Sequence, residues 1–168
     1  MASIETPYRI LVVCMGNICR SPMAEAVLRR AFTDAGLPVE VDSAGTGDWH
    51  VGEPAHPNTM RMLQMNGYAL EHSARALKGS WLDQRDLVLT MDQQNRRALL
   101  ALATSDQATR IRMFRSFDSA LQGLPEHDEA LNVPDPYYGT LEDYREVLTM
   151  IESAALGLVS YVEQVRTQ

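Results

Sequence analysis

The segment RILVVCMGNICRSP occupies residues 9–22 and decides the fold. Its first part, residues 9–14, is a short apolar and β-branched run, which is typical of a buried parallel strand. A tight turn with glycine and asparagine follows. Ser21 is then suited to the N-cap of a helix and Pro22 to its first helical position. The segment therefore predicts a strand, a tight loop and a helix in direct succession.

Strand and helix signals alternate along the rest of the chain. The first helix is expected to end at Gly36 and Pro38. Thr140 and Asp143 resemble a capping box, which predicts a long final helix after them. Residues 115–139 hold several Pro, Gly and Asp residues and predict a surface loop. We expect the other strands at residues 39–43, 86–91 and 110–114, and the other helices at residues 57–66 and from the cap Asp92 to residue 102.

Alternating strands and helices predict an α/β fold with a parallel sheet that is covered on both faces. With right-handed crossovers, we expect a doubly wound sheet of four strands in flavodoxin-like order. We expect one domain over residues 1–168, with residues 1–7 as a flexible N-terminus. Ligands of such folds bind beyond the carboxyl ends of the strands, and residues 14–20 lie there.

Composition narrows the classes of function. The net charge is −7 and no basic run exists, which argues against nucleic acid as a partner. No apolar run approaches the ~20 residues that span a bilayer, so no membrane association is expected. The first seven residues carry no Sec-type signal, which predicts a cytoplasmic location; export without a recognisable signal stays open. Two neighbouring cysteines in a reducing compartment indicate catalysis or redox chemistry rather than a disulfide scaffold.

The loop after the first strand has the residues of an anion-binding site. Backbone N–H groups wrapped around a point form a nest, and the following helix adds its own free N–H groups. Arg20 supplies a planar fork for two phosphate oxygens. Cys14 lies at the floor, where these donors and the Ser21 hydroxyl stabilise its thiolate. The alternative, a core cysteine and a surface arginine, is disfavoured by the strand, the Gly-Asn turn and the Ser-Pro helix start. The predicted phosphate-binding loop comprises Met15, Gly16, Asn17, Ile18, Cys19 and Ser21.

Two segments resemble one known family. Residues 14–25, CMGNICRSPMAE, resemble the signature loop of the low-molecular-weight protein tyrosine phosphatases. Residues 135–139, DPYYG, are similar to the general-acid loop of that family. The resemblance spans nearly the whole chain and is strongest to bacterial members. Further matches, in family order, are residues 42–46 (DSAGT) followed by Trp49, residues 72–75 (HSAR) and residues 91–95 (MDQQN).

This resemblance implies a two-step reaction on phosphotyrosine in proteins. Cys14 attacks phosphorus and forms a cysteinyl-phosphate, Arg20 clamps the phosphate, and Asp135 protonates the departing phenolate. Asp135 then acts as base toward the water that releases phosphate. Read alone, Asp135 before Pro136 is also common turn chemistry. No cofactor is implied, and no metal, because His50, His56 and His127 show no ligand spacing.

Other matched positions imply supporting roles. Trp49 and the pair Tyr137 and Tyr138 are expected to wall a slot for a phenyl ring. Met15 departs from the Leu or Thr that is frequent in the family, and we expect it to line the mouth. Asn17, Ser43 and His72 match a hydrogen-bonded network behind the loop. Asp92 is interpreted as a helix cap.

The two cysteines also predict redox regulation. We expect Cys14 to be an exposed thiolate that peroxide oxidises to a sulfenic acid. Cys19 is then expected to attack it and form a protective disulfide, and the family resemblance points the same way. The alternative is that Cys19 only packs within the loop.

Rival functions fit the residues less well. Thioredoxin-coupled arsenate reductases need cysteines outside the loop, and this chain has none. Protein arginine phosphatases carry Thr where Ile18 stands and lack the paired tyrosines. A non-catalytic phosphotyrosine-binding module would have lost Cys14, Arg20 or Asp135. A nucleotide P-loop needs Gly-Lys-Ser/Thr, which is absent from the sequence. Expected partners are tyrosine-phosphorylated proteins and, as a further candidate, a cognate tyrosine kinase; we expect a monomer.

Overall fold

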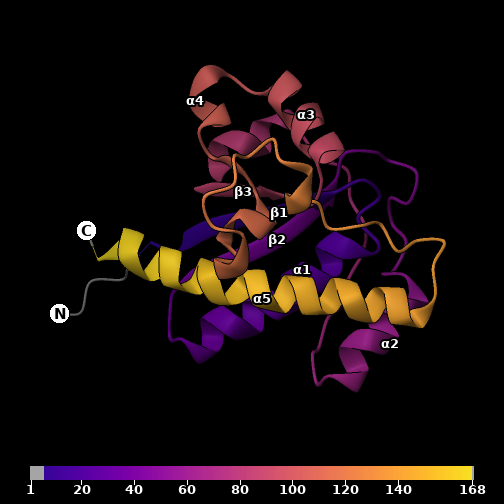
Figure 1. Cartoon of the computed structure of the whole chain (residues 1–168). Helices are drawn as coiled ribbons and strands as arrows, with labels where there is room; N and C mark the ends of the chain where they lie inside the picture. The colour runs from indigo at the N-terminus through magenta and orange to yellow at the C-terminus, as the bar shows by residue number, and fades with distance from the viewer. Residues whose placement is uncertain (1–5, 168) are drawn as a thin grey trace.

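The computed structural model describes residues 6–167 of the chain. Its centre is one parallel sheet in the order β2-β1-β3-β4, which confirms the predicted doubly wound, flavodoxin-like arrangement (Figure 1). Each strand is short and mostly buried, as is typical of parallel strands covered on both faces. The strands are β1 (Tyr8–Cys14), β2 (Val39–Gly45), β3 (Leu87–Thr90) and β4 (Ile111–Met113).

Helices cover both faces of the sheet. In Figure 1, α5 runs beside α1 on one side, near α2, while α3 and α4 lie on the other side. Alternate residues of β1 divide between two apolar cores: Ile10 packs with residues of α1 and α5, and Leu11 packs with Leu99 of α3. The helices are α1 (Arg20–Asp34), α2 (Pro57–Met65), α3 (Gln93–Leu102), α4 (Ser105–Ala108) and α5 (Leu141–Arg166).

The central strand β1 places the loop that follows it. β1 pairs with β2 on one side and with β3 on the other, so its carboxyl end lies where the connections leave in opposite directions. This is the switch point at which doubly wound sheets bind ligands. Cys14, the last residue of β1, and Arg20, the first residue of α1, therefore flank the loop at that point.

The start of α1 differs from the prediction. Ser21 is not the N-cap: α1 begins at Arg20, with Cys19 at the cap position and no side-chain cap. Pro22 is consequently the third helical residue. The Ser21 hydroxyl is instead turned into the preceding loop, where it meets the side chains of Cys14 and Asn17. A serine hydroxyl at a helix start can cap the helix or bond to a neighbouring loop. Here Ser21 bonds to the loop.

The segment 115–139 is more ordered than the predicted surface loop. It contains most of η2 (Phe114–Phe117) and all of η3 (Ser119–Leu121) and η4 (Glu129–Leu131). Phe117, Leu131 and Val133 are buried, so part of the segment belongs to the core. The short elements η1 (Gly79–Gln84) and α4 also escaped prediction, because runs this short carry little periodicity.

The N-terminal prediction is only partly covered by the structure. Residues 1–5 of the expected flexible segment 1–7 lie outside the described residues. The Thr6 carbonyl accepts a hydrogen bond from Arg166 Nη2 at 3.2 Å, which ties the beginning of the described chain to the end of α5. Among the helices formed by residues 6–167, we find none with the length and apolar character of a membrane span.

Candidate active site

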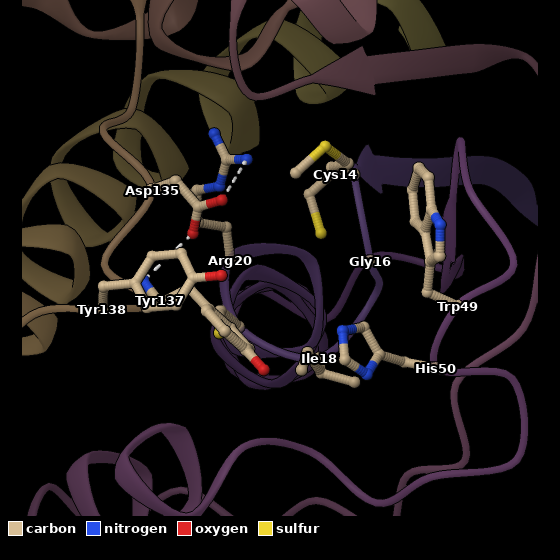
Figure 2. A pocket seen from close by; sticks show the side chains of 11 residues that line it. Cys14, Gly16, Ile18, Arg20, Trp49, His50, Asp135, Tyr137 and Tyr138 are labelled. Atoms are coloured by element: carbon tan, nitrogen blue, oxygen red, sulfur yellow. Dashed lines mark hydrogen bonds and ion pairs between the residues drawn. The ribbon is translucent and has the colours of Figure 1, made fainter.

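A cavity of about 250 Å³ opens at the carboxyl end of β1. Figure 2 shows Trp49 on one side of it, Asp135 and Tyr137 on the other, and Cys14 between them. The loop after β1, the segment near residue 50 and the segment near residue 135 thus meet around one space. The cavity is lined by Cys14, Met15, Gly16, Ile18, Cys19, Arg20, Trp49, His50, Asp135, Tyr137 and Tyr138.

Cys14 lies at the floor of this cavity. The Asn17 backbone N–H donates to its Sγ at 3.3 Å, and Ser21 Oγ lies 3.0 Å from the same sulfur. Both groups can donate to a thiolate, as the sequence predicts. The expectation of an exposed Cys14 is wrong, because only 2% of the residue is accessible. The sulfur ends a central strand, and a reagent reaches it only through the cavity.

Asn17 organises the loop from behind. It has a φ of 58°, the left-handed conformation that asparagine tolerates better than most residues. Its Nδ2 donates to Ser21 Oγ at 2.8 Å and to Ser43 Oγ at 3.0 Å. Its carbonyl accepts from His72 Nε2 at 2.6 Å, and its Oδ1 accepts from the backbone N–H of Arg75 at 3.0 Å. The structure thus brings together the three residues of the predicted network.

Arg20 is buried between two carboxylates. Its Nη1 donates to Asp92 Oδ2 at 2.6 Å and to the Val133 carbonyl at 2.9 Å, while Nη2 lies 3.5 Å from Asp135 Oδ2. Burial alone would lower the pKa of Arg20, but the nearby Cys14, Asp92 and Asp135 together raise it above its usual value. Arg20 Nε is buried and has no hydrogen-bond partner within residues 6–167, so a donor is still free.

Asp92 has two functions, of which sequence reasoning found one. Its Oδ1 accepts from the Asn95 backbone N–H at 2.8 Å, so it caps α3 as predicted. Its Oδ2 simultaneously holds Arg20, and this the sequence did not indicate. Only the position of Asp92, two residues after the end of β3 at the edge of the sheet where the loop lies, could have suggested it.

Asp135 and the aromatic residues surround the mouth. The Asp135 side chain is 37% exposed, and its Oδ1 accepts from the Tyr137 backbone N–H at 3.2 Å. The Tyr137 ring is half-buried and packs edge-on against Tyr138, with 4.7 Å between ring centroids. Trp49 and Tyr138 are largely exposed, at 69% and 97%. The predicted walls therefore all line the cavity, but only Tyr137 is packed firmly into the fold.

His50 is a lining residue that the sequence reasoning missed. Its Nδ1 lies 2.7 Å from Glu53 Oε2, and its ring centroid lies 5.8 Å from that of Tyr137. A Cβ on Gly16 would stand only 2.9 Å from His50 Cδ2, so glycine allows the ring to approach the loop. Adjacency to Trp49 was the one available signal.

Cys19 is buried at the end of the loop that follows Cys14, and both cysteines are free thiols. The Cys19 sulfur lies 3.4 Å from the Tyr144 hydroxyl. Burial raises the pKa of Cys19 to about 12, against a smaller opposing effect of the Tyr144 hydrogen bond. Cys19 is therefore a protonated thiol at neutral pH. Within residues 6–167, no three His, Cys, Asp or Glu side chains form a group that could hold a metal ion.

Comparisons with known proteins agree with this geometry. The family model described as low molecular weight phosphotyrosine protein phosphatase matches residues 9–168. A low molecular weight protein-tyrosine-phosphatase of Streptomyces coelicolor is 48% identical over 160 residues, covering 94% of each chain. Low molecular weight protein-tyrosine phosphatase A of Mycobacterium tuberculosis is 41% identical, covering 96% of this chain and 95% of that protein.

Solved structures show the same fold. A protein tyrosine phosphatase from Entamoeba histolytica, with Hepes in the active site, has a TM-score of 0.87 and 29% identity, covering 95% of this chain and 99% of that one. A YwlE arginine phosphatase mutant with a phosphorylated active-site serine has a TM-score of 0.82 and 26% identity, covering 95% and 98%. With a family model that matches nearly its whole length and relatives above 40% identity, the chain belongs to the low molecular weight phosphotyrosine protein phosphatase family.

Proposed function

We propose that this protein hydrolyses phosphotyrosine in proteins through a cysteinyl-phosphate on Cys14. The observation that carries the proposal is the position of the Cys14 sulfur at the floor of a cavity, with hydrogen-bond donors from Ser21 and Asn17 and with Arg20 and Asp135 facing it. These are a nucleophile, an anion site and a proton donor in one space.

The first step transfers the phosphoryl group. The Cys14 thiolate attacks phosphorus, an S–P bond forms, and the P–O bond to the tyrosine breaks. Loop N–H groups and the free Arg20 Nε are the donors for the phosphoryl oxygens. The phenol of tyrosine has a pKa of ~10, so its anion is a poor leaving group. Asp135 therefore protonates the departing oxygen.

The second step regenerates the enzyme. The Asp135 carboxylate takes a proton from water, and the oxygen of that water attacks phosphorus. The S–P bond breaks and inorganic phosphate leaves. Arg20, held by Asp92 and the Val133 carbonyl, stays in place through both steps. A fixed guanidinium stabilises charge without reorganisation in either step.

The cavity favours an aryl phosphate. Tyr137, Tyr138 and Trp49 line its mouth and Ile18 its side, which suits a flat ring on a long stem. A phosphoserine side chain is too short to bring its phosphate past these walls to Cys14. Phosphoarginine is the second candidate, because a structurally similar protein is an arginine phosphatase.

Matched phosphopeptides test the proposal. We expect hydrolysis of the phosphotyrosine peptide without added metal, little hydrolysis of the phosphoserine and phosphoarginine peptides, and no turnover by Cys14→Ser. Equal rates on phosphoserine, or a higher rate on phosphoarginine, would overturn the assignment. The single phosphatase domain, the cytoplasmic location, the monomeric state and a cognate kinase stay predictions.

A further inference from the structure

Tyr137 is supported by a residue outside the cavity. The His56 ring contacts Tyr137 edge-on, with 5.7 Å between centroids and 68° between planes. The same ring stacks on Tyr144 of α5 at 5.1 Å and 25°. Tyr144 is fully buried, so it gives the His56 ring a rigid surface to stack on. His56 thus lies between a core aromatic residue and a proposed wall of the substrate slot.

The His56 ring is also oriented by a hydrogen bond from the first turn of α2. His56 is the N-cap of α2, and its Nδ1 accepts from the Asn58 backbone N–H at 3.1 Å. Its backbone N–H donates to the Ile18 carbonyl at 2.8 Å, which ties it to the phosphate-binding loop. Burial lowers the pKa of His56, which agrees with an unprotonated Nδ1 that accepts a hydrogen bond.

The other rings around Tyr137 are less firmly held. Tyr138 is almost fully exposed. The His50 side chain is hydrogen-bonded to the side chain of Glu53, an exposed residue three positions later. Tyr137 itself packs against the core, and among these three rings His56 adds a link to buried Tyr144 and, through the Ile18 carbonyl, to the loop.

We propose that His56 is a positioning residue for aryl recognition, which holds the Tyr137 ring against the phenyl group of the substrate. The inference rests on the proposed phosphotyrosine activity and adds a specificity determinant to it. His56 acts through Tyr137 and leaves Cys14, Arg20 and Asp135 untouched. Its removal therefore weakens substrate binding and spares the chemical steps.

Two substitutions separate the ring from the cap. His56→Asn keeps a side-chain acceptor for the α2 N-terminus but removes the ring. We expect it to raise KM for a phosphotyrosine peptide about two- to tenfold, the scale of one aromatic pair, with kcat unchanged. His56→Phe keeps a ring but loses the acceptor. It should lower the Tm by about 2–4 °C and leave KM close to the wild-type value.

His56→Phe is the control for destabilisation, because it loses the cap and keeps a ring. If destabilisation alone weakened binding, His56→Phe would raise KM. That outcome, or an unchanged KM in His56→Asn, overturns the proposal. Where His56→Asn folds poorly, His56→Phe still decides, because a raised KM in this variant contradicts the inference and a normal KM supports it.

A double-mutant cycle tests the route through Tyr137. KM is measured for His56→Asn, Tyr137→Ala and the double variant. If His56 acts by holding Tyr137, the double variant has the KM of Tyr137→Ala alone; additive effects contradict this. Failure of the underlying function is distinguishable, since the wild-type protein would then not hydrolyse the phosphotyrosine peptide at all.

Discussion

Arg20 and Asp92 form an ion pair with 2.6 Å between Nη1 and Oδ2, although 72 positions separate them in the sequence. The Arg20 side chain is 2% exposed and that of Asp92 is 19% exposed. The second oxygen of Asp92 caps α3. Asp92, at the start of α3, therefore fixes the guanidinium of Arg20, the first residue of α1.

The pair predicts different effects for two substitutions of Asp92. Asp92→Asn keeps the cap of α3 but loses the charge, so we expect reduced kcat/KM with a nearly normal free energy of unfolding. Asp92→Ala also leaves a buried donor of Arg20 unsatisfied and should cost about 1–3 kcal/mol. Chemical denaturation measures this cost. Asp106→Ala, which removes an exposed partner of Arg110, is the control and should change little. Equal stability of Asp92→Ala and wild type would contradict the buried pair.

The general-acid assignment predicts a dependence on the leaving group. Asp135→Asn should slow hydrolysis of phosphotyrosine peptides by ~10²–10⁴. The loss should shrink for phenols of low pKa, which leave without a proton. Rates across a series of substituted phenyl phosphates measure this. A loss that is independent of the leaving group would mean that another residue donates the proton.

The redox prediction concerns Cys14 and Cys19. Peroxide should convert the Cys14 thiol to a sulfenic acid and water, and Cys19 should then displace water to form a disulfide that a thiol reductant opens. Wild type should recover activity after reduction and show a Cys14–Cys19 peptide. Cys19→Ser should recover far less; equal recovery without a cross-linked peptide would rule out protection.

The environment of Cys19 sets the pH dependence of that disulfide. Because its pKa is raised to about 12, the attacking thiolate is scarce at neutral pH. Below this pKa the thiolate fraction grows as pH rises, so disulfide formation should accelerate about tenfold per pH unit. Trapping the cross-linked peptide at several pH values, after a brief peroxide pulse, measures the slope. A rate that is flat with pH would show that Cys19 is not the attacking group.

Close packing of α5 predicts a stability effect at Gly157. A Cβ there would lie 1.7 Å from the Phe117 carbonyl oxygen, which is backbone and cannot turn away. Gly157→Ala should therefore destabilise the protein by about 1–3 kcal/mol, despite the better helix propensity of alanine. Gly79→Ala is the matched control, because its added Cβ meets nothing within 4 Å. Thermal melting measures the stability of both variants, and equal Tm values for the two would contradict the close packing at Gly157.

Local signals were sufficient for the sheet and the loop. Residues 9–14 form a buried strand, and the loop and helix after them follow directly, so their order is fixed by neighbouring residues. The predicted network of Asn17, Ser43 and His72 came from family resemblance, and the structure joins these residues by hydrogen bonds. Their proximity depends on the pairing of β1 with β2, which composition alone does not specify.

Errors arose where tertiary contacts of a side chain, rather than its residue type, decide the structure. Ser21 has the residue type of an N-cap, but a sulfur seven positions earlier and the Asn17 amide compete for its hydroxyl. Segment 115–139 looks polar, yet Phe117 and Leu131 turn into the core. His50 and His56 carry no motif, because what matters is their position around Tyr137, which lies more than eighty residues later.

The bond from Arg20 Nη1 to the Val133 carbonyl spans 113 positions and has a consequence for biosynthesis. Cys14 and Arg20 leave the ribosome early, when their partners near residue 133 have not been translated. The guanidinium lacks its acceptors, and the proposed acid Asp135 is absent, until about four-fifths of the chain exists. We therefore expect nascent chains to lack phosphatase activity, which should appear only when the two distant parts of the polypeptide have packed together.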